Sequence, residues 1–413
     1  MTQAGRGMGP LRGVKVIDLT SVLMGPYATQ IFADLGADVI KVEAPSGDTT
    51  RYLPPGPADN LGAMFMNVNR GKRSIVLDLK QAAARDVLLK LTSTADVFIH
   101  SMRGQAMERL GLSYAPVREA NPAIIYANLY GFGRAGPYAD YPAYDDIVQA
   151  ASGIVSLQAS LSGGEPTYLA TVVADKVAGL TAAYAVSAAL FERERSGLGQ
   201  ELEVPMFETL ASFAMVEHLC GSLFDPPIGP TGYPRATSPH RKPYKTKDGY
   251  IAVMIYNDKH WRSFFDAIGN PDWSKQPMFS DIRARTENIG IVLSHVADTL
   301  ATRTTDEWMA LFKKAECPAM PIATIDDLLE DPHLDAVGFW QRQETASGTI
   351  RMPGQPVNFS EPPGAVGKPG PPLGAHGTEI LAEAGYSKGD MAALRETGAL
   401  GGDASELVDS QAG

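Results

Sequence analysis

The chain has few cysteines, and it shows neither a metal-binding spacing of histidines nor a segment typical of a signal peptide. Cys220 and Cys317 are its only cysteines. Two cysteines without metal-ligand spacing exclude a disulfide scaffold and a zinc site, and they favour the cytoplasm as the compartment. The seven histidines show no spacing such as H-E-x-x-H, and no Ser nucleophile elbow is present, so we expect no bound metal and no serine hydrolase. The start MTQAGRGMGPLRG lacks the apolar core of a signal peptide.

Positive charge and long hydrophobic runs are also scarce. The formal net charge of −11 excludes a nucleic-acid partner, because such proteins need a basic surface to replace the counterions of phosphates. The longest apolar run, 172–191, contains Asp175 and Lys176 and is richer in Ala than in Leu or Ile, so it predicts a buried helix and no membrane contact. With 44% hydrophobic and 20% charged residues in 413, the chain is typical of a globular enzyme of about two domains.

The first third of the chain alternates short apolar runs with helical patterns. Runs that are apolar on both faces predict a parallel sheet covered by helices on both sides, which is a doubly wound α/β fold. Ligands of such sheets lie beyond the carboxyl ends of the strands, at the point where the strand order reverses. The expected strands are 14–19, 38–43, 74–79, 95–100 and 123–129, and the segments that follow them are 21–26, 43–48, 77–80 and 100–104.

A second, smaller α+β domain is expected where the composition changes. After Phe224 the chain becomes rich in Pro, Gly and basic residues, as a linker does. We therefore expect a large domain over 1–224, a small domain over 225–335, and a segment over 336–413 that returns to the large domain. Within the small domain the pattern predicts a strand at 249–255 and helices at 258–268, 289–302 and 306–316.

Asp175 is the one carboxylate near the start of the predicted Ala-rich helix. Thr171 is a candidate cap, and the positive end of the helix dipole favours the ionised form of a carboxylate one turn further on. An ionised, poorly solvated carboxylate is a nucleophile. The alternative is a structural ion pair between Asp175 and a Lys or Arg.

Three further motifs point to no function. GFGRAG at 131–136 matches the dinucleotide pattern, but Pro137 follows where a helix should open, which indicates a turn. GKRS at 71–74 lacks the upstream glycine of a phosphate loop and is typical of a solvated basic turn. His218 lies in the apolar stretch ASFAMVEHLC, which favours a core histidine.

Seven segments between Leu11 and about Gly385 carry a family resemblance. They are PLRGVKVIDLT, MGPYATQIFADLGADVIKVEAP, NRGKRSIVLDLK, RLGLSY, GPYADYPAYDDIVQAASG, VADKVAGLTAAYAVSAAL and PPLGAHGTEIL. On these segments the chain resembles the family III CoA-transferases, which include formyl-CoA transferase, carnitine CoA-transferase and the related 2-methylacyl-CoA racemases. The resemblance implies a Rossmann-like large domain built from both termini, a small central domain, and an interlocked homodimer.

The resemblance implies that Asp175 is the catalytic carboxylate of a CoA-transferase. It would attack an acyl-CoA thioester and give a mixed anhydride and then an aspartyl-CoA thioester. The substrates would be an acyl-CoA and a small carboxylic acid, with no permanently bound cofactor. The implied CoA contacts are Leu23, Met24, Leu77, Lys80, Ser101, Met102, Arg103, Arg109, Ala143, Tyr144 and Asp145.

Two other functions remain open, a racemase-like isomerase and a CoA-binding homologue without activity. The racemases carry His where this chain has Tyr144, and a tyrosine with a pKa of about 10 is a poor acid–base substitute for histidine. That difference favours acyl transfer.

The chain departs from formyl-CoA transferase at Leu23 and Ala44, where that enzyme has polar residues, and it has no Gly-rich lid. The segment SPHRKPYKTKDG stands where that lid would be. Its basic residues are expected either to receive the second carboxylate of a diacid or to form a basic surface loop. These residues are His240, Arg241, Lys242 and Lys245.

Overall fold

The computed structural model describes residues 7–161, 163–345 and 348–402. The chain divides into two compact units. The large unit takes residues 1–151, 171–211 and 334–413, and the small unit takes residues 152–170 and 212–333. The sequence predicted domain boundaries after residues 224 and 335. The structure divides the chain after residues 211 and 333, and residues 152–170 also belong to the small unit.

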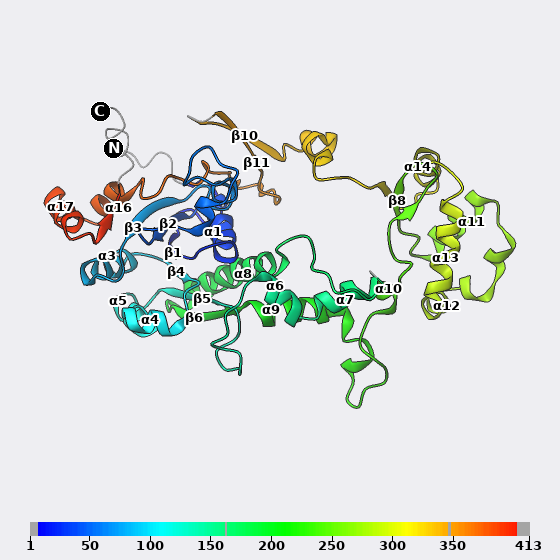
Figure 1. The fold of residues 1–413 in the computed structure, drawn as a ribbon, viewed down its shortest axis with the longest axis horizontal. Helices are drawn as coiled ribbons and strands as arrows, with labels where there is room; N and C mark the ends of the chain where they lie inside the picture. The colour runs from blue at the N-terminus through cyan, green and yellow to red at the C-terminus, as the bar shows by residue number, and fades with distance from the viewer. Residues whose placement is uncertain (1–6, 162, 346–347, 403–413) are drawn as a thin grey trace. The chain divides into compact units, whose positions relative to one another are not determined.

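A seven-stranded sheet forms the centre of the large unit (Figure 1). Its strand order is β12-β3-β2-β1-β4-β5-β6. Strands β1 to β6 run parallel, and β12 pairs antiparallel with β3 at the edge. The order reverses between β1 and β4, as in doubly wound sheets. The strands are β1 (Lys15–Leu19), β2 (Asp38–Glu43), β3 (Arg73–Leu77), β4 (Val97–His100), β5 (Ile125–Tyr130), β6 (Gln200–Pro205) and β12 (Leu400–Gly401).

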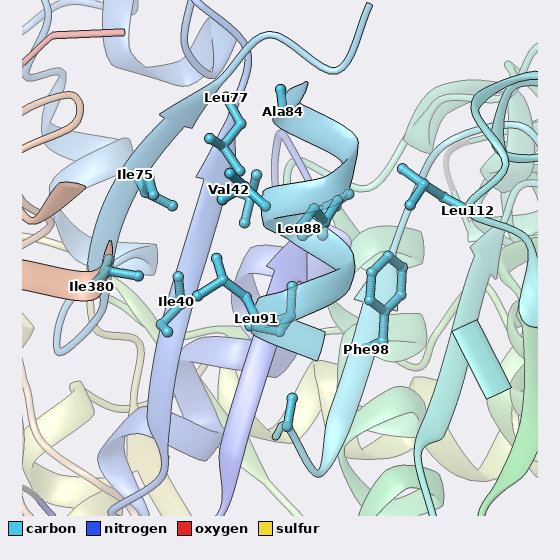
Figure 2. Close-up of a cluster of buried hydrophobic side chains, with 14 of the residues drawn as sticks. Ile40, Val42, Ile75, Leu77, Ala84, Leu88, Leu91, Phe98, Leu112 and Ile380 are labelled. Atoms are coloured by element: carbon cyan, nitrogen blue, oxygen red, sulfur yellow. The ribbon is translucent and has the colours of Figure 1, made fainter. Parts of the chain in front are cut away.

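Helices pack on this sheet because its central strands are buried on both faces. Figure 2 shows Leu88 and Leu91 of α3 (Ala82–Thr92) over Ile40 of β2 and Phe98 of β4. Ile380, which comes from α16 (Gly377–Glu383) near the other end of the chain, belongs to the same cluster. Each of these side chains is almost fully buried, which stabilises the fold by about 1.5–3 kcal/mol apiece. The prediction of an α/β fold with a large parallel sheet is confirmed.

Helix α8 (Val173–Ser196) packs closely against α1 (Met24–Asp34). The contact is close because α8 presents Ala178 and Gly179, both buried, to α1. A Cβ atom on Gly179 would lie 2.7 Å from the carbonyl oxygen of Met24. By length and composition α8 alone among the described helices could cross a membrane, and 44% of its most apolar stretch is buried inside the protein.

The remaining elements of the large unit connect the sheet strands or lie in its C-terminal segment. Helix α9 (Met206–His218) begins in the large unit and ends in the small one. The others are η1 (Thr49–Tyr52), α2 (Ala63–Val68), α4 (Gly104–Leu110), α5 (Tyr114–Ala120), α6 (Asp145–Ala151), β10 (Trp340–Thr345), β11 (Gly348–Pro353) and α17 (Lys388–Glu396), while α15 (Pro332–Ala336) crosses the division.

The small unit has a three-stranded antiparallel sheet and a helical layer around an aromatic core. Trp308 and Phe312 of α14 stack on each other, and Phe312 stacks on Phe264 of α11. Strand β8 and the helices α11, α13 and α14 match the elements expected from the sequence. The elements are α7 (Ile154–Leu161), η2 (Cys220–Leu223), α10 (Pro234–Thr237), β7 (Tyr244–Lys245), β8 (Tyr250–Val253), α11 (Asp258–Ile268), η3 (Asp272–Lys275), η4 (Pro277–Phe279), α12 (Ile282–Glu287), α13 (Ile289–Leu300), α14 (Thr305–Lys314), β9 (Ala319–Pro321) and η5 (Asp327–Glu330).

Candidate active site

Two cavities lie at the carboxyl ends of the parallel strands in the large unit. Cavity A, about 610 Å³, is formed by the ends of β1, β2 and β3 together with α4. Cavity B, about 600 Å³, is formed by the ends of β1, β4 and β5 together with the start of α8. Ser21, which follows β1, lines both. Both volumes lie in the range of small-molecule sites, and their place matches the reversal of strand order between β1 and β4.

Cavity A combines apolar walls with two exposed cations. Leu77 and Met102 supply apolar surface, while Lys80 and Arg109 carry the cations. Lys41 and Glu43 also line cavity A, but each forms a buried ion pair, Lys41 with Asp48 and Glu43 with Arg51. Lys80 and Arg109 are therefore the cations of cavity A that are open to an anionic group such as a phosphate.

Cavity B contains the half-buried side chain of Asp175. The predicted contacts Met24, Ser101, Arg103, Ala143 and Tyr144 line the same cavity. The loop that carries Ala143 and Tyr144 lies directly against the end of β5, because a Cβ atom on Gly131 would come within 2.1 Å of the Cβ atom of Ala143. The glycine thus brings the loop close enough to form a wall.

Asp145 accepts hydrogen bonds from the first turn of α8, the helix that carries Asp175. Its Oδ1 atom accepts hydrogen bonds from the backbone N–H groups of Ala174, at 2.7 Å, and of Asp175, at 3.1 Å. Its Oδ2 atom accepts a bond of 2.6 Å from Gln149. A carboxylate that binds the second and third N–H groups of a helix does what an N-cap side chain normally does.

The prediction that Thr171 caps this helix is wrong. Val172 occupies the N-cap position and offers no side-chain acceptor. The hydroxyl of Thr171 instead accepts a hydrogen bond from Lys176. Because the free N–H groups are already satisfied by Asp145, helix α8 needs no cap from its own sequence.

The pKa of Asp175 is raised to about 6. Burial is the largest cause, the negative charge of Asp145 adds to it, and a hydrogen bond from the Met24 backbone opposes both. No ion pair of Asp175 occurs among the described residues, so the ion-pair alternative finds no partner there. At neutral pH the group is a carboxylate without a cation, which is the state a carboxylate nucleophile requires.

The turn between β1 and α1 is strained where the two cavities meet. Val22 has φ of 68°, a left-handed conformation that is unusual for a β-branched residue. Its N–H group donates to both oxygens of Asp48, at 3.3 and 3.2 Å. Asp48 is held in turn by the Lys41 ammonium at 3.0 Å. The buried pair therefore fixes the turn that presents Ser21 to both cavities.

Comparison with known proteins identifies the family of this chain. The family model described as CoA-transferase family III matches residues 11–377. The chain belongs to CoA-transferase family III. The prediction that it is an enzyme of this family is thereby confirmed.

Several family III proteins are similar over nearly the whole chain. Acetyl-CoA:oxalate CoA-transferase from Acetobacter aceti is 34% identical over 368 residues, which cover 87% of this chain and 91% of that protein. Succinate–glutarate CoA-transferase from Agrobacterium fabrum is 34% identical over 396 residues, covering 93% and 98%. A crystal structure of an aspartate-to-alanine variant of Rv3272 from Mycobacterium tuberculosis superposes with a TM-score of 0.81 at 30% identity, covering 91% and 100%.

Two residues expected at the site of this family III enzyme do not line either cavity. Leu23 is buried at the N-cap of α1. Asp145 is buried behind the start of α8, as described above. The basic residues His240, Arg241, Lys242 and Lys245 belong to the small unit.

The two segments that resemble phosphate-binding motifs, GKRS and GFGRAG, form contacts with carboxylates. Lys72 of GKRS is buried and pairs with Asp18 at 3.1 Å, so the prediction of a solvated turn is wrong for this residue. In GFGRAG the N–H groups of Gly133 and Arg134 donate to Glu208 and Glu203, at 2.9 and 2.7 Å. These contacts agree with the interpretation of GFGRAG as a turn.

Burial and charge pairing both act on the Asp18–Lys72 pair. Burial alone would raise the pKa of Asp18, but the charges of Lys72 and Lys41 lower it to about 2. Burial lowers the pKa of Lys72 to about 8, against the attraction of Asp18. The pair lies under the β1–α1 turn, because Lys72 also donates to the carbonyl of Pro26 and Asp18 accepts from Thr20.

Sequence reasoning missed Ser21 and Arg134, which line cavity B. Both lie in segments already marked, the tail of the first strand and the GFGRAG turn. Their position directly after β1 and β5 is the signal that identifies them.

Proposed function

We propose that this family III enzyme transfers CoA from an acyl-CoA donor to a small carboxylic acid, with Asp175 as the nucleophile. A carboxylate oxygen of Asp175 attacks the thioester carbonyl, the C–S bond breaks, and CoA leaves as a thiolate. The thiolate then attacks the Asp175 carbonyl of the mixed anhydride, which releases the donor acid and leaves an aspartyl-CoA thioester. The acceptor carboxylate repeats these steps in reverse order and regenerates Asp175.

The observation that carries this proposal is the half-buried carboxylate of Asp175, which lines cavity B and has no ion-pair partner among the described residues. Cavity B shares Ser21 with cavity A, and the exposed cations Lys80 and Arg109 line cavity A. In the proposed complex, Lys80 and Arg109 bind phosphates of CoA, and Leu77 and Met102 contact its apolar parts. The thioester end lies in cavity B, against Met24, Ser101, Arg103, Ala143 and Tyr144. Leu23 and Asp145 act from beneath the surface by holding the starts of α1 and α8.

A dicarboxylic acid is the proposed acceptor. The two CoA-transferases from Acetobacter aceti and Agrobacterium fabrum act, by their names, on oxalate, succinate and glutarate, and a further relative from Haloarcula hispanica is a succinyl-CoA:mesaconate CoA-transferase, 32% identical over 398 residues. All of these acids carry two carboxylates. A racemase is not favoured, because Tyr144 stands where a histidine would be needed.

We also propose that the enzyme is an interlocked homodimer in the cytoplasm. Support for a second copy comes from large apolar side chains exposed on α8 and α9, since such patches are typical of protein interfaces. Their exposed fractions are 67% for Tyr184, 60% for Phe191, 55% for Phe213 and 80% for Val216. Light scattering on the purified protein measures the assembly, and a monomeric mass would contradict the dimer.

The proposed location in the cytoplasm is supported by the cysteines. Both described cysteines are free, as a reducing compartment favours.

Covalent trapping tests the nucleophile. The protein is incubated with succinyl-CoA, treated with hydroxylamine or borohydride, and analysed by intact mass and peptide mapping. We expect an adduct at Asp175 and none in Asp175→Asn, while CoA still binds that variant. An adduct at another residue, or α-proton exchange of a branched acyl-CoA without any adduct, would overturn the assignment.

A further inference from the structure

A third cavity, of about 350 Å³, is formed entirely by residues of the small unit. Its floor is part of the aromatic core of that unit, because Tyr244, Ile255, Trp261, Ile289 and Val296 line it and are buried. None of the proposed CoA contacts takes part. The volume is at the lower end of the range for small-molecule sites.

Every charged residue that lines this cavity is a cation. These residues are Arg235, Arg241, Lys242 and Arg285, and no acidic residue is among the described lining. Arg241 and Lys242 are exposed, and neither forms an ion pair within the part of the chain that the structure describes. In a chain with a net charge of −11, a cavity with this lining selects for an anion.

Arg285 is the buried cation among the residues that line the cavity. It is 1% exposed, its Nη1 donates to the carbonyl of Phe279 at 3.0 Å, and its Nη2 pairs with Asp258. Its guanidinium carbon lies 5.6 Å from the centre of the Trp261 ring. The Nε atom is buried and has no hydrogen-bond partner among the described residues. A buried donor without an acceptor is costly. Because Arg285 lines the cavity, an anion bound there is a candidate acceptor for this donor.

Two further donors line the cavity. Arg235 lies 5.4 Å from the centre of the Tyr256 ring and donates to Thr286, which limits its freedom. Burial raises the pKa of Tyr244 to about 12, so its hydroxyl remains a donor at neutral pH. The lining of the cavity thus combines hydrogen-bond donors with hydrocarbon.

We propose that this cavity binds an organic carboxylate whose body is apolar, with the carboxylate at the cations and the body on the floor of the small unit. A single planar carboxylate matches the fork of an arginine. A phosphate or a diacid would place a further charge against Ile255, Ile289 and Val296, where nothing compensates it. This site goes beyond the proposed transfer reaction, and its occupancy is measurable without turnover.

Calorimetric titration of the full-length protein, saturated with CoA, tests the proposal with hexanoate as the probe. Hexanol, adipate and inorganic phosphate serve as comparisons. We expect hexanoate to bind at least about tenfold more tightly than hexanol, and we expect it to bind more tightly than adipate at the site that depends on Arg241 and Lys242. Equal binding of hexanol, no binding of hexanoate, or a tighter binding of adipate or phosphate that is lost when Arg241 and Lys242 are replaced would each overturn the proposal.

Two double variants of the same exposed loop locate the site. Arg241→Gln with Lys242→Gln removes cations from the lining, and we expect it to weaken hexanoate binding by about tenfold or more. His240→Gln with Lys245→Gln is the matched control, because neither residue lines the cavity. Unchanged binding in the first pair, or an equal loss in both pairs, would show that the cavity is not the site. Because Asp175 is intact in both, loss of labelling at Asp175 and loss of hexanoate binding are separate results.

Discussion

Asp145 accepts hydrogen bonds from the backbone N–H groups of Ala174 and Asp175, so one carboxylate fixes the helix that carries another. The arrangement has two opposite effects. Asp145 positions Asp175 at the wall of cavity B, and its charge helps to raise the pKa of Asp175. Position and acidity of the proposed nucleophile therefore depend on the same side chain.

Replacing Asp145 with Asn separates these two effects. The amide oxygen still accepts from the helix N–H groups, but the negative charge is lost, so the pKa of Asp175 should fall below about 6. Because the carboxylate form is active, turnover of the present enzyme should decline as the pH falls through about 6, and in the variant this decline should shift to lower pH. A pH–kcat profile measures the shift. Asp145→Ala is the comparison, and it should lose about 1 kcal/mol of stability because the cap is removed.

Replacing Asp175 with Asn should abolish turnover and stabilise the fold at neutral pH. Folding raises the pKa of this acid from 3.8 to about 6, so the native state binds the proton more tightly than the unfolded chain. The stability cost of the ionised form is absent below the unfolded pKa, grows as the pH rises from about 3.8 to about 6, and is complete above that pH. Thermal unfolding should show the variant more stable by up to about 3 kcal/mol at pH 8, with a smaller difference at about pH 5. A difference independent of pH would contradict the raised pKa.

Replacing Gly179 with Ala should loosen the contact between α1 and α8. The new Cβ atom would lie 2.7 Å from the Met24 carbonyl oxygen, which is backbone and cannot move freely. We expect a loss of about 1–3 kcal/mol in the free energy of unfolding and a lower kcat, since Met24 contacts Asp175. Gly290→Ala in α13 is the matched control, because nothing lies within 4 Å of its Cβ position. The control should be neutral or stabilising by about 0.5 kcal/mol.

Replacing Lys80 or Arg109 with Gln should raise KM for the acyl-CoA without a comparable loss of kcat. Both cations are exposed at cavity A, so each contact with a phosphate contributes about 1 kcal/mol, which corresponds to roughly a fivefold change in KM. Arg12→Gln, at an exposed residue that lines neither cavity, should change nothing. A fall in kcat with unchanged KM would place these residues elsewhere in the mechanism.

The sheet, and the edge where the two cavities lie, were predictable because the information is local. Runs such as 38–43 and 74–79 are apolar on both faces, and the segments after them face one edge of a parallel sheet whatever the rest of the chain does. The start of α8 was not predictable in the same way. Thr171 is a reasonable local cap, but the acceptor that satisfies Asp175 comes from a residue 30 positions away.

Buried charges were equally hidden from the sequence. Lys72 in the basic tetrapeptide GKRS is typical of a surface turn, and only the fold brings it to Asp18, 54 positions away. The cations of the small-unit cavity were visible as a basic loop, yet the sequence did not distinguish Arg241 and Lys242 from their neighbours His240 and Lys245. Arg285, which joins them from α12, lies more than forty positions further along the chain.

The pairing of β12 with β3 has a consequence for synthesis of the protein on the ribosome. Leu400 pairs with Leu77, and Ile380 lies in the same core as Ile40, so the sheet is completed only by the last part of the chain. The segments of the small unit end at residue 333 and leave the exit tunnel earlier. In a nascent chain the whole small unit is therefore available to fold before β12 has been synthesised. The edge of β3 is unpaired at this stage, and it is then that chaperones would be needed most.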